Sequence, residues 1–388
     1  MQPTLRFPEF KDEWSYNLFN NIVTNRSKKF NPSTEEATND IELDSIEQNT
    51  GRLLNTYMSN QFTSQKNIFN KNSVLYSKLR PYLNKYYYAQ IEGVCSSEIW
   101  VLNTLNKDVL SNKFLYYFIQ TNRFSSVANK SAGSKMPRAD WGLVENIRLY
   151  RGPIEEQEKI GEFFSKLDQQ IELEEKKLEL LKQQKKGYMQ KLFSQELRFK
   201  DENGNEYPNW QTVKIGSILK ERKERSGDGE MLSVTINHGI VKFDDIDRKD
   251  NSSKDKSNYK KVYKNDIAYN SMRMWQGASG KAEFDGIVSP AYTVVTPIEN
   301  INSSFIAYYF KTHNMIHKFR INSQGLTSDT WNLKYKQLKD IKISICSKEE
   351  QDKIANLLTI LDIRIKKQNH KLEILNINKK GLLQKMFV

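Results

Sequence analysis

Four short stretches of the sequence have compositions suited to contacts with nucleic acid: three combine basic residues with small polar or aromatic ones, and the fourth contains Gln, Gly and hydroxyl residues. Arg and Lys can hold phosphates or bind guanine edges, Gln and Asn can bind adenine, and Gly lets backbone N–H groups approach a phosphate. The stretches are S-K-L-R-P-Y (77–82), A-G-S-K-M-P-R (132–138), N-S-M-R-M-W-Q (270–276) and Q-G-L-T-S (324–328). The candidate contact residues are Lys78, Arg80, Tyr82, Gly133, Ser134, Lys135, Arg138, Ser271, Arg273, Trp275, Gln276, Gly325 and Thr327.

Each stretch, taken alone, is also typical of a solvated surface turn with no functional role. The functional interpretation gains support from recurrence, since Arg80 has a counterpart in Arg273 and Gly133 has one in Gly325. We therefore keep both interpretations for each stretch.

The overall charge favours a polyanionic partner. Among 388 residues, Lys and Arg number 60 against 47 Asp and Glu, which gives a formal net charge of +13. Such an excess indicates nucleic acid or an anionic membrane face rather than a neutral small molecule. The mean hydropathy of −0.72 and the lack of a long apolar run argue against a membrane span. The polar segment 1–14 is unlike a signal peptide, so we expect a soluble, cytoplasmic protein.

Residues for catalysis or metal binding are not recognisable. The string closest to a phosphate-binding loop, residues 275–282, lacks the first Gly and the hydroxyl residue, and no dinucleotide-binding or adenine-methyltransferase motif is present. His313 and His317 have the spacing of a zinc pair but no supporting Glu or Cys, so we expect structural histidines. Cys95 and Cys346 are too few for a disulfide framework or a four-thiolate zinc site. The sequence predicts no catalytic residue and no metal site.

The chain contains an internal duplication. Residues 155–193 and 349–387 are identical at 18 of 39 positions at a constant offset of 194. Both begin with E-E-Q-x-K-I and end with K-K-G-x-x-Q-K-[LM]-F. Weaker similarity extends upstream at an offset of 193, where residues 74–82 and 93–102 correspond to 267–275 and 286–295. The layout is thus a globular module, a long helix, a second module and a second long helix.

The two long segments have the heptad pattern of a coiled coil. Their seam positions, which we expect to serve helix pairing or partner docking, include Ile160, Phe164, Leu167, Ile171, Leu178, Leu181, Ile354, Leu358, Leu361, Ile365, Leu372 and Leu375. Polar residues interrupt the seams at Glu174, Lys185, Gln368 and Lys379, which fits a device that fixes register. Each helix could pack on its own module, but we favour an intramolecular antiparallel coiled coil related by a pseudo-twofold axis. Without the helices, +11 of the charge remains on the modules.

The modules are predicted to be α+β. Strands are expected at Val74–Leu79, Ile99–Asn103, Ile147–Tyr150, Val288–Thr296 and Ile341–Ile345, and short helices at Lys113–Thr121 and Phe305–His313. We predict modules at 1–153 and 197–347, with helices at 154–196 and 348–388.

This layout resembles the specificity subunit of type I DNA restriction–modification systems. The helix-start and helix-end strings and S-K-L-R-P-Y-L at 77–83 carry the resemblance, which covers essentially the whole chain. The second module departs from that string, because it has N-S-M-R-M-W-Q, so its DNA contacts rest mainly on Arg273 and Gln276.

The resemblance implies a non-catalytic, cytoplasmic bacterial defence protein. Each module would be a target recognition domain for one half of a bipartite, asymmetric sequence in double-stranded DNA. The helices would set the spacing and dock two methyltransferase subunits for adenine methylation, and two restriction/translocase subunits would join them to cleave DNA. S-adenosylmethionine, ATP and Mg²⁺ would then be bound by these partners and no cofactor by this chain.

Two other function classes remain as alternatives. A stand-alone nuclease or methyltransferase with a duplicated body would need an acidic metal cluster or a cofactor loop, and the sequence shows neither. A purely structural coiled-coil adaptor would not need a charge of +11 on its modules.

Overall fold

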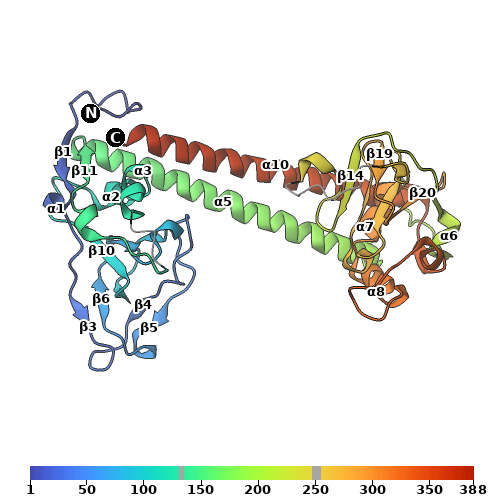
Figure 1. Ribbon diagram of the computed structural model, residues 1–388, viewed down its shortest axis with the longest axis horizontal. Helices are drawn as coiled ribbons and strands as arrows, with labels where there is room; N and C mark the ends of the chain where they lie inside the picture. Colours follow the sequence, from blue (N-terminus) through green and yellow to red (C-terminus); the bar gives the residue numbers. More distant parts are fainter. Residues whose placement is uncertain (131–134, 247–254) are drawn as a thin grey trace. The chain divides into compact units, whose positions relative to one another are not determined.

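The computed structural model describes residues 1–130, 135–246 and 255–388 (Figure 1). It forms two compact units. Unit 1 comprises Met1–Glu175 and His370–Val388, and unit 2 comprises Lys176–Asn369. Each unit contains one globular module and a part of each of the two long helices, α5 (Ile154–Phe193) and α10 (Lys348–Met386).

The module of unit 1 contains three sheets, with strand orders β1-β11, β2-β10-β7-β8 and β3-β6-β9-β4-β5. The strands are β1 (Ser15–Leu18), β2 (Val23–Thr24), β3 (Lys29–Phe30), β4 (Asn39–Ile41), β5 (Tyr57–Met58), β6 (Lys66–Phe69), β7 (Val74–Ser77), β8 (Tyr86–Tyr88), β9 (Gly93–Ser96), β10 (Ile99–Thr104) and β11 (Arg148–Arg151). The short helices are α1 (Phe19–Ile22), η1 (Ser59–Gln61), η2 (Pro81–Leu83), α2 (Asn112–Phe118), α3 (Asn122–Ala128) and α4 (Trp141–Val144).

The module of unit 2 repeats this plan, with strand orders β12-β21, β13-β20-β17-β18 and β15-β14-β19-β16. The strands are β12 (Gln211–Lys214), β13 (Leu219–Glu221), β14 (Met231–Thr235), β15 (Gly239–Lys242), β16 (Lys260–Val262), β17 (Ile267–Asn270), β18 (Ser279–Lys281), β19 (Gly286–Val288), β20 (Tyr292–Pro297) and β21 (Lys342–Ile345). The short helices are α6 (Ile215–Ile218), η3 (Phe243–Asp245), η4 (Met274–Gln276), α7 (Ser303–Tyr309), α8 (His313–Asn322) and α9 (Tyr335–Leu338).

Apart from β3, which has no counterpart among the strands of the second module, the two modules share strand order and strand direction. In each, one parallel pair, β4 with β9 and β14 with β19, interrupts an otherwise antiparallel pattern. The duplication inferred from the helices therefore extends through both modules, although little of their sequence is similar.

The central strands are apolar on both faces because cores lie on both sides of the sheet. Val74 and Tyr76 of β7 pack into the core that contains the helices, whereas Leu75 packs into the core beneath the five-stranded sheet. The same alternation places Ile267 and Ala268 of β17 in different cores of unit 2. A continuous apolar run is expected for a strand covered on both faces.

Most predicted elements are found within a few residues of the expected bounds, but Val288–Thr296 is wrong as a single strand. It is two strands, β19 and β20, joined by a turn in which Tyr292 N–H donates to Ser289 O at 2.9 Å. Pro290 lies in this turn and has no N–H to continue a ladder, which explains the break. The predicted helix Phe305–His313 is also two helices, since α7 ends at Tyr309 and α8 begins at His313.

The repeated E-E-Q string fixes each long helix to its module. In unit 1, Glu156 is fully buried and accepts hydrogen bonds from Arg6 Nε and Nη2 at 2.8 and 2.7 Å and from Trp14 Nε1 at 2.8 Å. The neighbouring Gln157 accepts from Ser111 N–H at 3.1 Å and donates to Val109 O at 3.0 Å. The motif is therefore a buried anchor.

Unit 2 contains the same anchor. Glu350 is fully buried and accepts from Arg198 Nε and Nη2 at 3.1 and 2.7 Å. Gln351 accepts from Asn302 N–H and donates to Cys346 O, both at 2.9 Å. Arg6 and Arg198 belong to the repeated L-R-F strings, so each string supplies the cation that compensates a buried carboxylate.

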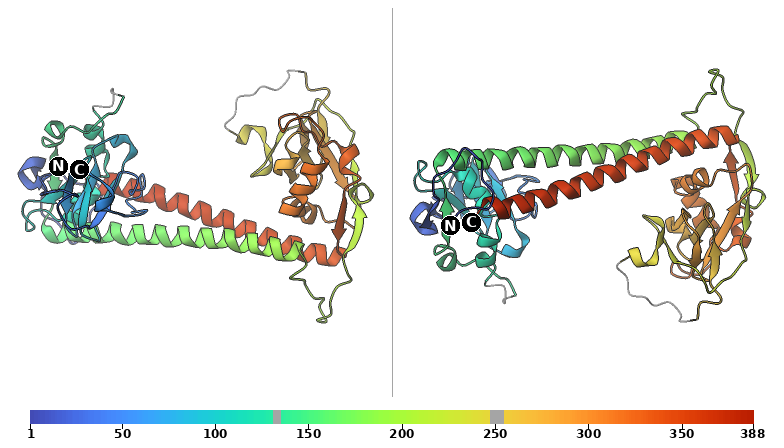
Figure 2. Two further views of the ribbon diagram at one scale, coloured as in Figure 1. Left: turned by 90° about the horizontal axis from the view of Figure 1, so that it is seen from below. Right: turned by 90° about the horizontal axis from the view of Figure 1, so that it is seen from above.

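The long helices pair in an antiparallel manner within each unit (Figure 2). In unit 1, Asp168 of α5 pairs with Lys379 of α10 at 2.6 Å, and Glu174 pairs with Lys371. As the residue number rises along α5 it falls along α10, which confirms the predicted antiparallel coiled coil. In unit 2, Lys185 pairs with Asp362 at 2.6 Å.

These ion pairs involve residues predicted to fix register. Lys185 and Lys379 are counterparts in the duplication, as are Asp168 and Asp362, so the same interhelical pair occurs once in each unit. Each aspartate also accepts from a module tyrosine: Tyr117 to Asp168 at 3.0 Å, and Tyr308 to Asp362 at 2.7 Å. Gln368, the remaining seam residue of α10, is buried. The polar seam positions thus connect helix, partner helix and module.

We predict that Glu156→Gln destabilises unit 1 by about 3 kcal/mol, because it leaves the Arg6 guanidinium without its carboxylate partner in a buried site. Hydrogen exchange of peptides from the first module and the end of α10 measures this. Glu158→Gln, on the exposed face of the same turn, is the matched control. Equal protection in both variants would contradict the anchor assignment.

Candidate nucleic-acid interface

In the first module, the structure brings the two predicted stretches together. Arg80 N–H donates to Pro137 O at 2.8 Å, and Ala139 N–H donates to Lys78 O at 2.8 Å. The stretch 77–82 leaves the end of β7, and Arg80 has a left-handed backbone (φ 51°) at the start of η2. A non-Gly residue in this region is strained, and such strain concentrates at functional sites.

The side chains of this surface are largely accessible. Arg80 and Lys135 are exposed, Tyr82 is 52% exposed, and Lys78 is half-buried. Arg138 is exposed but pairs with Glu98, with Nε at 3.0 Å from Oε2, so one predicted cation is partly neutralised. The predicted residues Gly133 and Ser134 lie outside the described residues.

The second module brings its two stretches together through the same backbone contact. Leu333 N–H donates to Ser271 O at 2.8 Å, as Ala139 does to Lys78 in the first module. Gln324 and Asn332 exchange two backbone hydrogen bonds of 3.0 and 2.8 Å, which close the loop between them. Arg273, Gln276 and Thr327 are exposed.

Ser271 must be corrected as a candidate contact. Its side chain is 4% exposed, and its hydroxyl shares a 2.8 Å hydrogen bond with Thr293 of β20. It fixes the loop to the sheet and does not present a hydroxyl at the surface. Gly325 has a conformational role, since its φ is 146° and a Cβ would lie 2.6 Å from Thr330 O.

Sequence reasoning missed Trp331, which forms an aromatic pair with the predicted residue Trp275 beside this loop. The ring of Trp331 meets that of Trp275 edge-on at 5.2 Å, and the guanidinium of Arg320 lies over Trp331 at 5.5 Å. Trp331 and Arg320 lie outside the predicted stretches. The position of Trp331, seven residues after Gln324 at the start of the fourth stretch, is a signal that could have extended the prediction. Leu326, at the tip of the same loop, is fully exposed.

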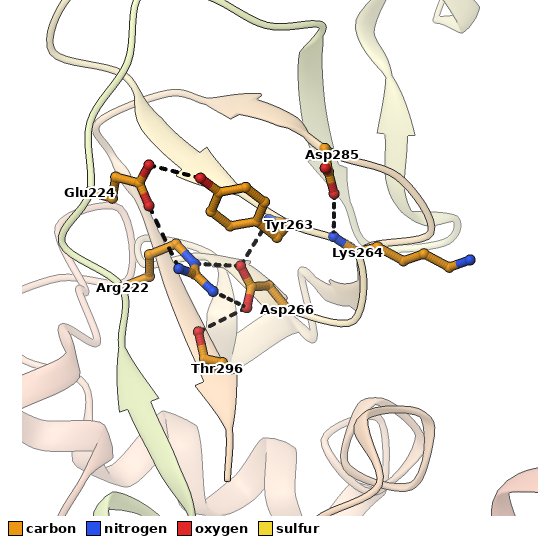
Figure 3. Close-up of polar contacts among 7 residues, drawn as sticks. All are labelled: Arg222, Glu224, Tyr263, Lys264, Asp266, Asp285 and Thr296. Carbon is orange, nitrogen blue, oxygen red and sulfur yellow. Dashed lines mark hydrogen bonds and ion pairs between the residues drawn. The ribbon is translucent and has the colours of Figure 1, made fainter. Parts of the chain in front are cut away.

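A buried carboxylate supports β17, the strand that leads into this loop (Figure 3). Asp266 is 2% exposed and accepts from Arg222 Nε at 2.6 Å, Tyr263 N–H at 2.9 Å and Thr296 Oγ1 at 2.8 Å. The Arg222 guanidinium also lies over the Tyr263 ring at 4.6 Å. Because these donors come from β20 and the segments around β13 and β17, the cluster holds three strands in place.

The described residues give no sign of a reactive or metal-binding centre. They contain no group of three or more His, Cys, Asp or Glu side chains placed to hold a metal ion. His313 and His317 are exposed on α8. Cys95 and Cys346 are buried, and burial raises the pKa of both thiols, which keeps them protonated. Across the described ranges, no helix is long and apolar enough to cross a membrane.

Comparison with known proteins identifies the family. The family model of the type I restriction modification DNA specificity domain matches residues 18–183 and 207–376. The chain belongs to this family. The two matched segments correspond to the two halves of the duplication, which agrees with one recognition module and one helix in each.

Similar proteins of known class are type I specificity subunits. The MjaVIII specificity subunit of Methanocaldococcus jannaschii is 30% identical over 133 residues, 33% of this chain and 31% of that protein. The Escherichia coli EcoDI specificity subunit is 28% identical over 156 residues, 39% and 34% of the two chains. The alignments thus cover about a third of the length of each of these curated relatives.

Solved structures share the fold over nearly the whole length. The S subunit of a type I restriction–modification system from M. genitalium superposes with a TM-score of 0.59 at 17% identity, covering 100% of this chain and 99% of that one. The HsdS subunit from Thermoanaerobacter tengcongensis gives 0.52 at 16% identity, with 96% of both chains covered. The resemblance and the α+β fold predicted from sequence are confirmed, and with them membership among specificity subunits rather than catalytic ones.

We predict that Asp266→Asn destabilises the second module by about 3 kcal/mol while the first module is unaffected, because the half-buried Arg222 loses its buried ion partner and keeps only the exposed Glu224 at 3.7 Å. Urea-dependent hydrogen exchange, followed separately in peptides of each module, measures the difference. Asp285→Asn, which removes an exposed carboxylate that accepts from Lys264 N–H, is the comparison variant. An equal effect of both substitutions would refute a supporting role for the cluster.

Proposed function

We propose that this chain is the DNA-recognition subunit of a type I restriction–modification complex, and that it recognises a bipartite, asymmetric sequence in double-stranded DNA. The paired loops of the two modules are the main support. Both pairs are closed by the same backbone hydrogen bond, yet one surface carries Arg80, Tyr82 and Lys135 and the other carries Arg273, Gln276 and a tryptophan pair. Two loop surfaces with the same backbone contact but different side chains are suited to two related but different half-sites.

The proposed role of each loop surface follows from its chemistry. The exposed Arg80, Lys135 and Arg273 would hold phosphates or bind guanine, and Gln276 would bind adenine. Tyr82 and Trp275 offer aromatic faces beside them. The net charge of +11 on the modules would draw the duplex to these surfaces.

The helices have a separate proposed role in spacing and assembly. Each of the two long helices contains about 40 residues, and they would set the distance between half-sites and dock two methyltransferase subunits. Two restriction/translocase subunits would then join. S-adenosylmethionine, ATP and Mg²⁺ would act on those partners, where the methylation and cleavage chemistry would take place.

The proposal is tested by co-expressing the chain with its methyltransferase partner and mapping methylated adenines across the host genome. Methylation within one split, asymmetric sequence is the expected result. The purified chain, incubated alone with S-adenosylmethionine, Mg²⁺ and plasmid, should leave the DNA unchanged. Methylation or cleavage by the chain alone would favour a stand-alone enzyme and refute the proposal.

Single arginine substitutions should weaken one half-site at a time. We expect Arg80→Ala and Arg273→Ala each to weaken DNA binding by the assembled complex by about 1–3 kcal/mol and to relax discrimination in one half only. Titration of labelled duplexes carrying substitutions in either half, at several salt concentrations, measures both effects. Arg364→Ala, an exposed arginine of α10, is the control. Unchanged binding by Arg80→Ala or Arg273→Ala would remove that residue from the interface.

Lengthening both helices should lengthen the unrecognised gap. A heptad inserted after Leu181 of α5 and another after Ile365 of α10, each within four residues of the Lys185–Asp362 pair, keeps the seam in phase. The insertion adds about 10.5 Å, or about three base pairs. The methylation map should show either a longer gap between unchanged half-sites or no methylation. An unchanged gap would show that the helices do not set the spacing.

A further inference from the structure

Unit 2 contains a cavity of about 770 Å³ between the last turns of α5 and the segment that joins α7 to α8. Its apolar lining includes Met189 and Phe193 of α5, Tyr309 of α7 and Ile316 of α8. Phe193 is only half-buried and stacks on Tyr309 with ring centroids 4.8 Å apart. The cavity therefore presents a preformed apolar surface to whatever enters it.

Cations surround this apolar lining. Lys182 and Lys186 are exposed, lie one turn apart on α5 and make no ion pair with any described residue. Lys311 donates to Ile236 O at 2.8 Å and to Gly277 O at 2.5 Å, and it contacts no carboxylate in the described part of the chain. Burial, with a smaller contribution from Lys185, lowers the pKa of Lys311 to about 8, so it is still largely protonated at neutral pH. Among the described residues, Lys185 of the cavity is compensated by Asp362, whereas Lys182, Lys186 and Lys311 have no carboxylate partner.

The corresponding place in unit 1 lacks some of these cations. The duplication relates Lys182 to Asn376 and Lys186 to Lys380. The helix α10 of unit 1 therefore has only one of these two lysine charges. Alignment of the helix caps Thr121 and Thr312 relates Lys311 to Gln120. Lys379 retains the charge of Lys185 and Arg123 replaces Asn314, so the two halves of the duplicated scaffold carry different arrangements of cations at this place.

We propose that this cavity receives an acidic segment with an apolar anchor residue from one methyltransferase subunit, and that it does so once per chain. The apolar anchor would pack against Met189 and Phe193, and flanking carboxylates would pair with Lys182 and Lys186. A protein segment with an apolar side chain fits better than duplex DNA, because the bases of a duplex are stacked inside the helix and its exposed backbone is charged. This inference rests on the proposed function, which supplies the methyltransferase partner.

The cavity is also connected to the candidate DNA-recognition loop of the second module, residues 270–276. Lys311 holds the carbonyl of Gly277, which directly follows Gln276 at the end of the candidate interface. A carboxylate that pairs with Lys311 would therefore lie one residue from that loop.

The test measures stoichiometry of the full chain with its methyltransferase partner by native mass spectrometry and by titration. The wild-type chain should bind two partners. Lys182→Glu with Lys186→Glu should accumulate a one-to-one complex, with the dissociation constant for the second partner raised about tenfold or more. The matched control is Asn376→Glu with Lys380→Glu, at the corresponding positions of unit 1, which should still bind two partners with unchanged affinity.

A second variant tests the apolar part. Gln190 is exposed at the cavity, so Gln190→Trp should fill the space without disturbing the core and should also give a one-to-one complex. Gln384→Trp at the corresponding position of α10 is its control. Circular dichroism and hydrogen exchange verify that each variant is folded.

These measurements distinguish a failure of the proposed function from a failure of this inference alone. A wild-type chain that binds no methyltransferase overturns the proposed function and this inference together. Two partners bound with unchanged affinity by both unit 2 variants overturn the inference alone. Unchanged stoichiometry with weaker DNA binding would show that Lys182 and Lys186 contact phosphates, and it would also overturn the proposed docking site.

Discussion

Each module is held to the long helix that follows it by one fully buried carboxylate, Glu156 in unit 1 and Glu350 in unit 2. A charge removed from water is tolerated only where it is paired and hydrogen-bonded, and Arg6 and Arg198 supply that compensation. Each ion pair therefore fixes three parts relative to one another: the start of the long helix, the edge of the module and the L-R-F segment that contains the arginine. A few turns later, Asp168 and Asp362 connect the same helices to a module tyrosine and to a lysine of the opposite helix. The anchors explain why the helix strings are so similar between halves whose modules have diverged.

The two modules keep a common arrangement of strands but differ in their buried ionic groups and loop side chains. Strand order is the same in both except for the additional edge strand β3 of the first module, but the buried ionic groups differ. The first module pairs Lys66 with Asp40 at 2.8 Å, both fully buried, whereas the second uses Arg222 and Asp266. The loops at the end of β7 and β17 likewise share one backbone hydrogen bond and little side-chain chemistry. The loop surfaces can thus be altered without disturbing the helices, which suits the proposed recognition of two different half-sites.

The long helices, their antiparallel pairing and the family could all be predicted from the sequence, because heptad spacing and a 39-residue repeat are local signals. Strand order could not, since pairing such as that of β4 with β9 joins residues more than 50 positions apart. The two candidate stretches of each module were found by composition, but their contact with each other could not be inferred. Ser271 was misjudged and Trp331 was missed for the same reason: burial and ring contacts depend on packing across the module. The anchoring role of the E-E-Q string also needed the structure, because a charged helix start is usually exposed.

Under the proposed function, two independent modules on one helical frame each recognise one half of a DNA target. This central claim is tested most directly by exchanging residues 197–347 for the same region of a relative, co-expressing the chimera with the methyltransferase partner and mapping methylated adenines. The chimera should change one half of the methylated sequence and leave the other half and the gap between them intact. A change in both halves, or in neither, would contradict independent recognition by two modules.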